Sequence, residues 1–336
     1  MQRLEQDLRG GLLSFNGSVM MKRVFLFPGQ GSQVVGMGKD LYDNFSKARL
    51  IFEEAEDVLK IKLRKLCFEG SESDLKLTAN TQPALLTVSI AACHVLETET
   101  DFKPSLVAGH SLGEYSALVV AHALSFSKAI ELVRTRGKFM QEAVPVGKGA
   151  MAALLGAEAN VAQGLCEEVT QKFHQENKQE EFVSPANFNG AGQVVVAGTR
   201  AAVQCCVEMA SQKGIKRALL LDVSAPFHCK LMEPAAQKMA KVLEIVSFLP
   251  LQIPYIANVD AHIYSGRDVP VRDLLIRQIP NPVRWEESML KLSQCEIEQA
   301  IEIGAGKVLT GLLRRINKDI KTLNIQTSED IKTMSS

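Results

Sequence analysis

A serine flanked by glycines, between an apolar strand and an apolar helix, constrains this chain more than any other feature. The pentapeptide Gly109-His110-Ser111-Leu112-Gly113 follows the apolar run 105–108 and precedes a helical pattern over 114–121. A serine in such a turn sits in a strained backbone conformation, and small neighbours relieve the crowding. The pattern therefore predicts a nucleophile elbow with Ser111 exposed at its tip. The alternative is an ordinary glycine-rich turn between a strand and a helix.

Short apolar runs alternate with longer amphipathic ones along most of the chain. Strands are expected at 23–27, 105–108, 254–258 and 299–303, and helices at 44–60, 82–97, 114–121 and 307–317. The helix at 82–97 is expected to start from Asn80 or Thr81 as cap, with Pro83 in its first turn. Strands and helices in alternation predict an α/β domain with a mostly parallel sheet.

The middle of the chain follows a different order. Strands are expected at 151–155, 182–188, 193–197 and 216–221, with helices at 158–173 and 200–213. This βαββαβ order is that of the ferredoxin-like unit. We therefore expect a small ferredoxin-like subdomain inserted into the larger α/β subdomain, with its two ends close together.

These patterns divide the chain into four segments. Residues 1–20 lack periodicity and are expected to be a disordered extension. Residues 21–146 and 222–320 are expected to form the large catalytic subdomain, and residues 147–221 the small one. Residues 321–336 are expected to be a C-terminal tail.

Composition excludes several classes of protein. Among 336 residues, 38 Lys and Arg balance 38 Asp and Glu, so the chain lacks the basic excess of a nucleic-acid binder. It contains no apolar run of the length needed to span a membrane. Its seven cysteines show no C-x-x-C pair, which favours free thiols in a reducing, cytoplasmic environment. Neither an H-E-x-x-H motif nor Cys/His spacing indicates a metal site, and we expect no cofactor.

A nucleophilic serine needs a base, and most of the histidines are poor candidates. His94 and His122 lie in apolar helical patterns and are expected to pack in the core. His174 and His262 lie in polar loops and are expected at the surface. His110 adjoins the serine, but neighbouring side chains at a sharp turn point apart, so we expect it to support the site.

His228 is the best candidate base. It follows a predicted strand and a turn that contains Pro226, where catalytic groups often collect. The group that would orient it is left open: Asp222 precedes it by six residues, and a backbone carbonyl would serve equally well. A hydrolase triad in the order Ser, Asp/Glu, His is therefore incomplete in this sequence.

A second glycine-rich loop, residues 27–33, follows the first strand. It is not a dinucleotide-binding fingerprint, because Val34 occupies a position that requires glycine. It is not a P-loop either, because no Gly-Lys-Ser/Thr sequence follows at the required spacing. Such a loop can supply a backbone N–H to an oxyanion hole. Arg136 follows in a helical pattern; it is either a surface arginine or a buried guanidinium that binds a carboxylate through two hydrogen bonds.

Taken together, the motifs resemble the bacterial malonyl-CoA:acyl carrier protein transacylases. The resemblance runs from about residue 22 to 320 and rests on the following segments: 27–33, 109–117, 136–141, Asn189 with 193–198, His228, Gln278 with 281–283, and 304–309. It implies an acyltransferase with a hydrolase-like large subdomain and a ferredoxin-like small one. It also implies malonyl-CoA as substrate, acyl carrier protein as partner, and a monomer serving fatty acid biosynthesis.

The resemblance also implies roles for individual residues. Ser111 would be the acyl nucleophile, His228 its base, and the backbone N–H groups of Gln30 and Leu112 the oxyanion hole. Arg136 would bind the malonyl carboxylate, with His110 and Gln278 as further substrate-binding residues. A main-chain carbonyl near Gln278 would orient the base.

Two other functions share the same residues. A serine thioesterase or esterase could use the same elbow, and it would hydrolyse its acyl-serine quickly in the absence of an acceptor thiol. A non-catalytic carrier-binding domain could retain the fold, and its Ser111 would not be labelled by malonyl-CoA.

Overall fold

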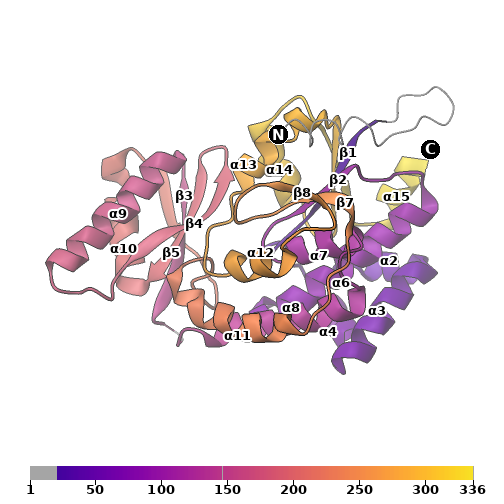
Figure 1. The fold of residues 1–336 in the computed structure, drawn as a ribbon, viewed down its shortest axis with the longest axis horizontal. Helices are drawn as coiled ribbons and strands as arrows, with labels where there is room; N and C mark the ends of the chain where they lie inside the picture. Colours follow the sequence, from indigo (N-terminus) through magenta and orange to yellow (C-terminus); the bar gives the residue numbers. More distant parts are fainter. Residues whose placement is uncertain (1–20, 146, 336) are drawn as a thin grey trace.

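A six-stranded sheet, parallel except at one edge, forms the centre of the larger lobe (Figure 1). In spatial order its strands are β10 (Lys321–Ile325), β9 (Gln299–Ile303), β1 (Arg23–Phe27), β2 (Leu106–Gly109), β7 (Leu251–Ile256) and β8 (Ile263–Gly266). The computed structural model describes residues 21–145 and 147–335. Only β8 runs antiparallel to its neighbour, β7.

Helices cover both faces of this sheet. They are α2 (Lys39–Asn44), α3 (Ser46–Leu59), α4 (Leu63–Glu69), α5 (Glu72–Lys76), α6 (Thr78–Glu99), α7 (Gly113–Val120), α8 (Phe126–Glu142), α11 (Glu233–Glu244), α12 (Val271–Gln278), α13 (Trp285–Leu290), α14 (Val308–Ile316) and α15 (Ser328–Ser335). Single 3₁₀ turns occur at Ala210–Lys213, Lys230–Met232 and Ser293–Cys295.

Strand β1 shows why both faces must be covered. Phe25 and Phe27 belong to the core shared with α6 and α8, whereas Val24 and Leu26 belong to the core shared with α13 and α14. Successive side chains of a strand point to opposite faces, so an all-apolar strand is stable only between two layers.

The smaller lobe is a four-stranded antiparallel sheet with two helices, at the left of Figure 1. Its strands, in spatial order, are β4 (Val183–Gly190), β5 (Gln193–Thr199), β3 (Gly149–Leu155) and β6 (Arg217–Leu220), and its helices are α9 (Ala159–Gln175) and α10 (Arg200–Met209). Alternate residues of β3 and β5, such as Leu154 and Val196, form a separate core with these helices.

The predicted fold class is confirmed: a mostly parallel sheet carries the larger lobe, and the βαββαβ order forms the smaller one. The subdomain boundaries at 146–147 and 221–222 stay a prediction. The predicted disordered extension, residues 1–20, lies outside the described residues. In the described ranges, none of the helices is both long and apolar enough to cross a membrane.

Helix α6 begins earlier than expected. It starts at Thr78, so neither Asn80 nor Thr81 is its cap, and Pro83 lies inside the helix. Proline has no N–H, which leaves the carbonyl four residues back, that of Ala79, without a helical partner. The guanidinium of Arg134 on α8 donates to that carbonyl. A tertiary hydrogen bond therefore allows the helix to continue through a proline that sequence alone places at its start.

The predicted C-terminal tail is wrong as a description of residues 321–335. They form β10, which pairs with β9 along its whole length, and α15, whose Ile331 is buried in the large core. The backbone N–H of Ser328 at the start of α15 donates to the Asp40 carboxylate of α2. Lys, Asn and Thr between the apolar residues of β10 weakened its strand pattern, as is usual at the edge of a sheet.

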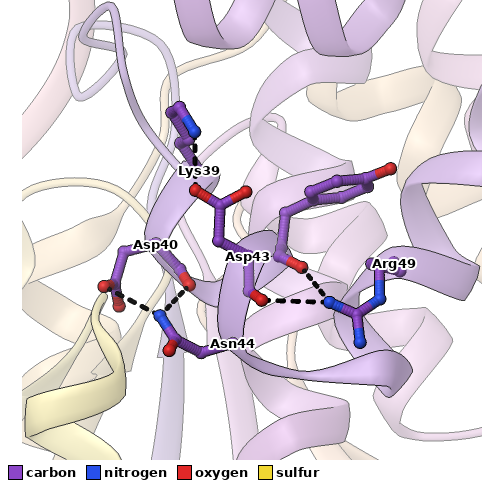
Figure 2. Close-up of polar contacts among 6 residues, drawn as sticks. Lys39, Asp40, Asp43, Asn44 and Arg49 are labelled. Carbon is purple, nitrogen blue, oxygen red and sulfur yellow. Dashed lines mark hydrogen bonds and ion pairs between the residues drawn. The ribbon is translucent and has the colours of Figure 1, made fainter.

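Side chains donate hydrogen bonds to backbone carbonyls of the short helix α2, as Figure 2 shows. The Asn44 amide donates to the Asp40 carbonyl, and Arg49 of α3 donates to the carbonyls of Tyr42 and Asp43. The carbonyls of Tyr42 and Asp43 are among the last four of α2, which a helix end leaves without helical partners. Arg49 therefore joins α2 to α3, and Asp40 joins α2 to α15.

Candidate active site

Ser111 lies at the tip of a left-handed turn between β2 and α7. Its φ is 51°, a region that non-glycine residues rarely occupy. A Cβ added to Gly109 would lie 1.9 Å from the carbonyl oxygen of Gly113, and one added to Gly113 would lie 2.0 Å from that of Phe27. The two glycines are therefore required by backbone packing around the serine, as the pentapeptide predicts.

Asn258, just beyond β7, braces this turn. Its Oδ1 accepts the backbone N–H of Ser111 at 2.6 Å, and its Nδ2 donates to the carbonyl of Gly109 at 2.7 Å. Both groups of the side chain are satisfied by the elbow, so Asn258 holds the strained residue in place. Sequence analysis did not single it out, although an asparagine at the carboxyl end of a strand beside β2 was a usable signal.

His228 is the base candidate that the structure brings to Ser111. Its Nε2 lies 2.7 Å from Ser111 Oγ, and its Nδ1 lies 2.9 Å from the carbonyl oxygen of Gln278. A carbonyl only accepts, so Nδ1 carries the proton and Nε2 presents its lone pair to the serine hydroxyl. Asp222 does not orient the histidine: it is exposed and pairs with Lys76 at 3.6 Å.

The histidine is buried and neutral. Burial, followed by the charge of Arg136, lowers the pKa of His228 to about 3. Its φ of 58° places it in the left-handed region, as with Ser111. A neutral imidazole with a free lone pair is the form that removes a proton, so the environment favours the basic state at all ordinary pH values.

Arg136 of α8 is buried beside the serine. Its Nη2 lies 3.2 Å from Ser111 Oγ and 2.7 Å from Oε1 of Gln278, while its Nη1 donates to Gln82 of α6 at 2.8 Å. None of these partners is a carboxylate, and Nε has no hydrogen-bond partner among the described residues. A buried cation without a counter-ion favours binding of an anion. Of the two alternatives given for Arg136, the surface side chain is excluded, because the guanidinium is buried.

Gln278, at the end of α12, lies behind Arg136. Its Oε1 accepts from Arg136, and its Nε2 donates to the carbonyl of Ser111 at 2.9 Å and to Glu114 at 2.8 Å. It is buried and is not among the residues that line the cleft. Its amide is occupied by the groups that hold the site, and its predicted contact with substrate stays a prediction.

A cleft of about 490 Å³ opens at Ser111 between the two lobes. Gln30 and Leu112 both line it, and neither backbone N–H donates a hydrogen bond to another described residue. Leu112 precedes the first turn of α7, where unpaired N–H groups and the positive end of the helix dipole favour negative charge. Both N–H groups are thus available to an oxyanion.

His110 joins the cleft wall to the smaller lobe. Its Nε2 lies 2.9 Å from Oδ1 of Asn189 on β4, and its ring packs against Trp285 with centroids 5.5 Å apart. Burial lowers the pKa of His110. These contacts make His110 part of the cleft wall, and its predicted contact with substrate stays a prediction.

Two of the remaining histidines differ from the sequence prediction. His94 and His122 were expected in the core, but both are exposed: His94 lies on the outer side of α6, and His122 lies in the turn after α7. Glu114 and Gln82 are functional neighbours that sequence analysis passed over. Both are fully or almost fully buried polar side chains in apolar helices, which is the signal that could have found them.

Comparisons with known proteins agree with this geometry. The acyl transferase domain family matches residues 24–334. A malonyl CoA-acyl carrier protein transacylase of Bacillus subtilis is 46% identical over 313 residues, which cover 93% of this chain and 96% of the relative. An acyl-carrier-protein S-malonyltransferase structure from Bartonella henselae has a TM-score of 0.87 at 46% identity, covering 93% of this chain and 98% of the other.

A third similar structure is a malonyl-transacylase in complex with its type II PKS acyl-carrier protein. It is 44% identical, has a TM-score of 0.88, and covers 93% of this chain and 98% of that one. The family match, the identity and the coverage on both sides support one assignment: this chain belongs to the acyl transferase family, among the malonyl CoA-acyl carrier protein transacylases.

Proposed function

We propose that the chain transfers a malonyl group from malonyl-CoA to the phosphopantetheine thiol of acyl carrier protein, through an ester on Ser111. The observation that carries this proposal is Arg136, a buried guanidinium without a counter-ion whose Nη2 lies 3.2 Å from the nucleophilic hydroxyl. It provides for an acyl group with a carboxylate at its far end. The transfer supplies malonyl groups to fatty acid synthesis.

In the first half-reaction, His228 Nε2 takes the proton of Ser111 as Oγ attacks the thioester carbon. The resting distance of 2.7 Å between these atoms allows direct transfer. General base catalysis of this kind contributes about 10²–10⁴ in rate. The Gln278 carbonyl accepts a hydrogen bond from the Nδ1–H group of His228 and so stabilises the imidazolium that forms.

The tetrahedral intermediate places negative charge on the former carbonyl oxygen. The N–H groups of Gln30 and Leu112 would donate to it, and loss of one such donor typically raises the barrier by about 3–4 kcal/mol. When the intermediate collapses, the carbon–sulfur bond breaks, and His228 returns the proton to the departing coenzyme A thiolate. Malonyl-Ser111 and coenzyme A are the products.

In the second half-reaction the same steps run in reverse. The carrier thiol gives its proton to His228 and attacks the ester carbon, and the serine leaves with that proton. Because the first product departs before the second substrate reacts, ping-pong kinetics are expected. No cofactor enters either step, and the absence of a cofactor stays a prediction, as does the cytoplasmic location.

The direct test is mass spectrometry of the protein after incubation with malonyl-CoA. One malonyl adduct that maps to Ser111 and disappears in S111A supports the proposal. Transfer to holo acyl carrier protein should then remove it. An adduct that is lost to water rapidly without an acceptor thiol would instead indicate a thioesterase, and no adduct at all would indicate a non-catalytic domain.

Substitution of Arg136 tests the selection of the acyl group. An acetyl group leaves the buried cation unpaired, which costs more than a missing methylene does. We expect R136A to lose at least about a hundredfold in malonyl loading, while acetyl loading survives or rises. The matched control is K128A on the same helix, whose ammonium pairs with Glu131 at the surface. Equal losses for both acyl groups in R136A would contradict the assigned role.

A further inference from the structure

Glu114 is a buried carboxyl group to which the mechanism above gives no role. It follows the elbow on α7 and is fully buried. Its Oε2 accepts the backbone N–H of Asn258 at 3.1 Å and Nε2 of Gln278 at 2.8 Å. Its Oε1 has no hydrogen-bond partner among the described residues. The carboxyl group thus contacts the residue that braces the serine and the residue that contacts the arginine.

The orientation of the Gln278 side-chain amide is fixed, because its oxygen and its nitrogen face different groups. Its Nε2 faces two acceptors, Oε2 of Glu114 and the carbonyl of Ser111, so its Oε1 must face Arg136. The reversed amide would place an NH₂ group against the guanidinium, where two donors would meet. Removing the Glu114 acceptor would leave the carbonyl of Ser111 as the one acceptor for Nε2, with the Arg136 guanidinium still facing Oε1.

We propose that Glu114 is a positioning residue for acyl-group selection: as a hydrogen-bond acceptor it fixes the Gln278 amide, which in turn aims the Arg136 guanidinium at the acyl carboxylate. This inference rests on the proposed function, because it assigns the carboxylate of the malonyl group to Arg136. Glu114 itself touches neither substrate nor the reacting atoms.

The charge of Glu114 matters because Arg136 must keep its own charge for the substrate. Burial is the main cause that raises the pKa of Glu114 to about 8; Asp260 adds a small raising effect, and Gln278, Asn258 and Arg136 oppose it. The carboxyl group is therefore neutral at pH 7. Ionisation at higher pH would place a fixed negative charge near the guanidinium and oppose binding of a second carboxylate.

Other titratable groups face Glu114: Tyr115, Tyr255, Arg136 and Asp260, which lies beyond β7. Burial raises the pKa of Tyr115, on the same helix, to about 12, and it raises the pKa of Tyr255 on β7 well above its ordinary value. Burial lowers the pKa of the Arg136 guanidinium on α8 from an ordinary value far above this range. E114Q removes the titration of Glu114 alone, so loss of the pH change in this variant assigns that change to Glu114.

The experiment compares loading of Ser111 from malonyl-CoA and acetyl-CoA, without acceptor thiol, in wild type, E114A and E114Q. Loss of a hydrogen bond to the Arg136 network should lower the malonyl/acetyl ratio of kcat/KM in E114A by about tenfold or more. E114Q keeps a neutral acceptor in the same place and should retain the ratio of the wild type. The loss in E114A should appear mainly in KM for malonyl-CoA.

The pH dependence supplies a second readout. From about pH 6.5 to about pH 9, a range that spans the Glu114 pKa of about 8, the wild-type ratio should fall up to about tenfold. E114Q cannot ionise, so its ratio should stay constant over that range. A purely structural glutamate would give losses that are equal for the two acyl groups and a ratio that does not change with pH.

E302Q is the matched control. Glu302 on β9 is also fully buried, and burial raises its pKa, but its partners are Thr310, Leu309 and Asn324, away from Arg136. Its substitution should leave the malonyl/acetyl ratio unchanged, and thermal unfolding reports whether any variant fails to fold. An unchanged ratio in folded E114A, or a low ratio in E114Q at neutral pH, would overturn the inference. Absence of malonyl loading in the wild type would instead overturn the proposed function.

Discussion

At the scale of single residues, the site depends on keeping one side chain neutral and another charged in the same buried space. His228 and Arg136 are both buried, and the charge of Arg136 disfavours charge on His228. The guanidinium keeps its proton because its ordinary pKa is far above that of imidazole. The histidine is therefore the member of the pair that stays neutral, and it is ready to accept the serine proton.

The pH profile of loading tests this arrangement. A base with an ordinary histidine pKa of about 6.5 would lose about eightfold in kcat/KM between pH 7 and pH 5.5. Because the pKa of His228 is lowered to about 3, we expect less than a twofold loss over that interval. Initial loading rates at low malonyl-CoA would measure it. A decrease in kcat/KM with a midpoint near pH 6.5 would contradict the prediction, because it would show that His228 has the pKa of an exposed histidine.

The same shift affects folding. A histidine whose folded pKa is lowered favours the neutral form, so its contribution to stability is present above its unfolded pKa of about 6.5. That contribution is lost as the pH falls from there toward about 3. The free energy of unfolding should therefore decrease below about pH 6.5, at pH values where His228 in the folded protein is still neutral.

At the scale of elements, the contact of α6 with α8 sets the geometry of acyl selection. Arg136 on α8 donates to Gln82 on α6 at 2.8 Å, so the spacing of the two helices decides where the guanidinium lies. Gly137 permits that spacing: an added Cβ would lie 2.7 Å from the carbonyl oxygen of Thr78 and 2.8 Å from Cα of Ala79. Both of these atoms are backbone, so the helices would have to separate.

We expect G137A to lower the free energy of unfolding by about 1–3 kcal/mol, as overpacking does, and also to reduce malonyl loading relative to acetyl loading. Its control is G164A in α9, where an added Cβ meets nothing within 4 Å. That change should raise stability by up to about 1 kcal/mol, because alanine favours a helix interior. Urea unfolding of the two variants makes the comparison. Similar stabilities in both would mean that the helices do not need the glycine.

What sequence could predict follows from the range of the interactions. The elbow, its two glycines and the alternation of strands and helices are local patterns, and they were predicted correctly. The brace of Asn258 on Ser111 spans 147 positions, and the contact of Gln278 with Glu114 spans 164. Periodicity carries no information about such pairs. Resemblance to a family named Gln278, but only the structure placed it behind Arg136.

At the scale of the whole molecule, the C-terminal segment is part of the catalytic lobe. Strand β10 pairs with β9, and α15 contributes Ile331 to the core that α6 also lines. The segment also reaches the cleft: the side chain of Gln326 accepts the N–H of Gly306, in the loop that leads to Val308 and Leu309 of the cleft wall.

Substitution of one isoleucine tests this. Ile331 is 1% exposed, and I331A should lower the free energy of unfolding by about 2–5 kcal/mol. Ile245 after α11 is 89% exposed, and I245A should stay within about 0.5 kcal/mol of the wild type. Thermal unfolding followed by circular dichroism compares the pair. Equal melting temperatures would show that the burial of Ile331 adds nothing to the stability of the large lobe.

The left-handed backbone of both Ser111 and His228 has a consequence for anyone who grafts this chemistry onto another scaffold. Each such residue stores about 1–2 kcal/mol of strain. A host given only a serine and a histidine would relax both turns and separate the pair. The transplant must therefore include the asparagine, the two close-packed glycines and the glutamine carbonyl, so the smallest portable unit is a set of braced backbones.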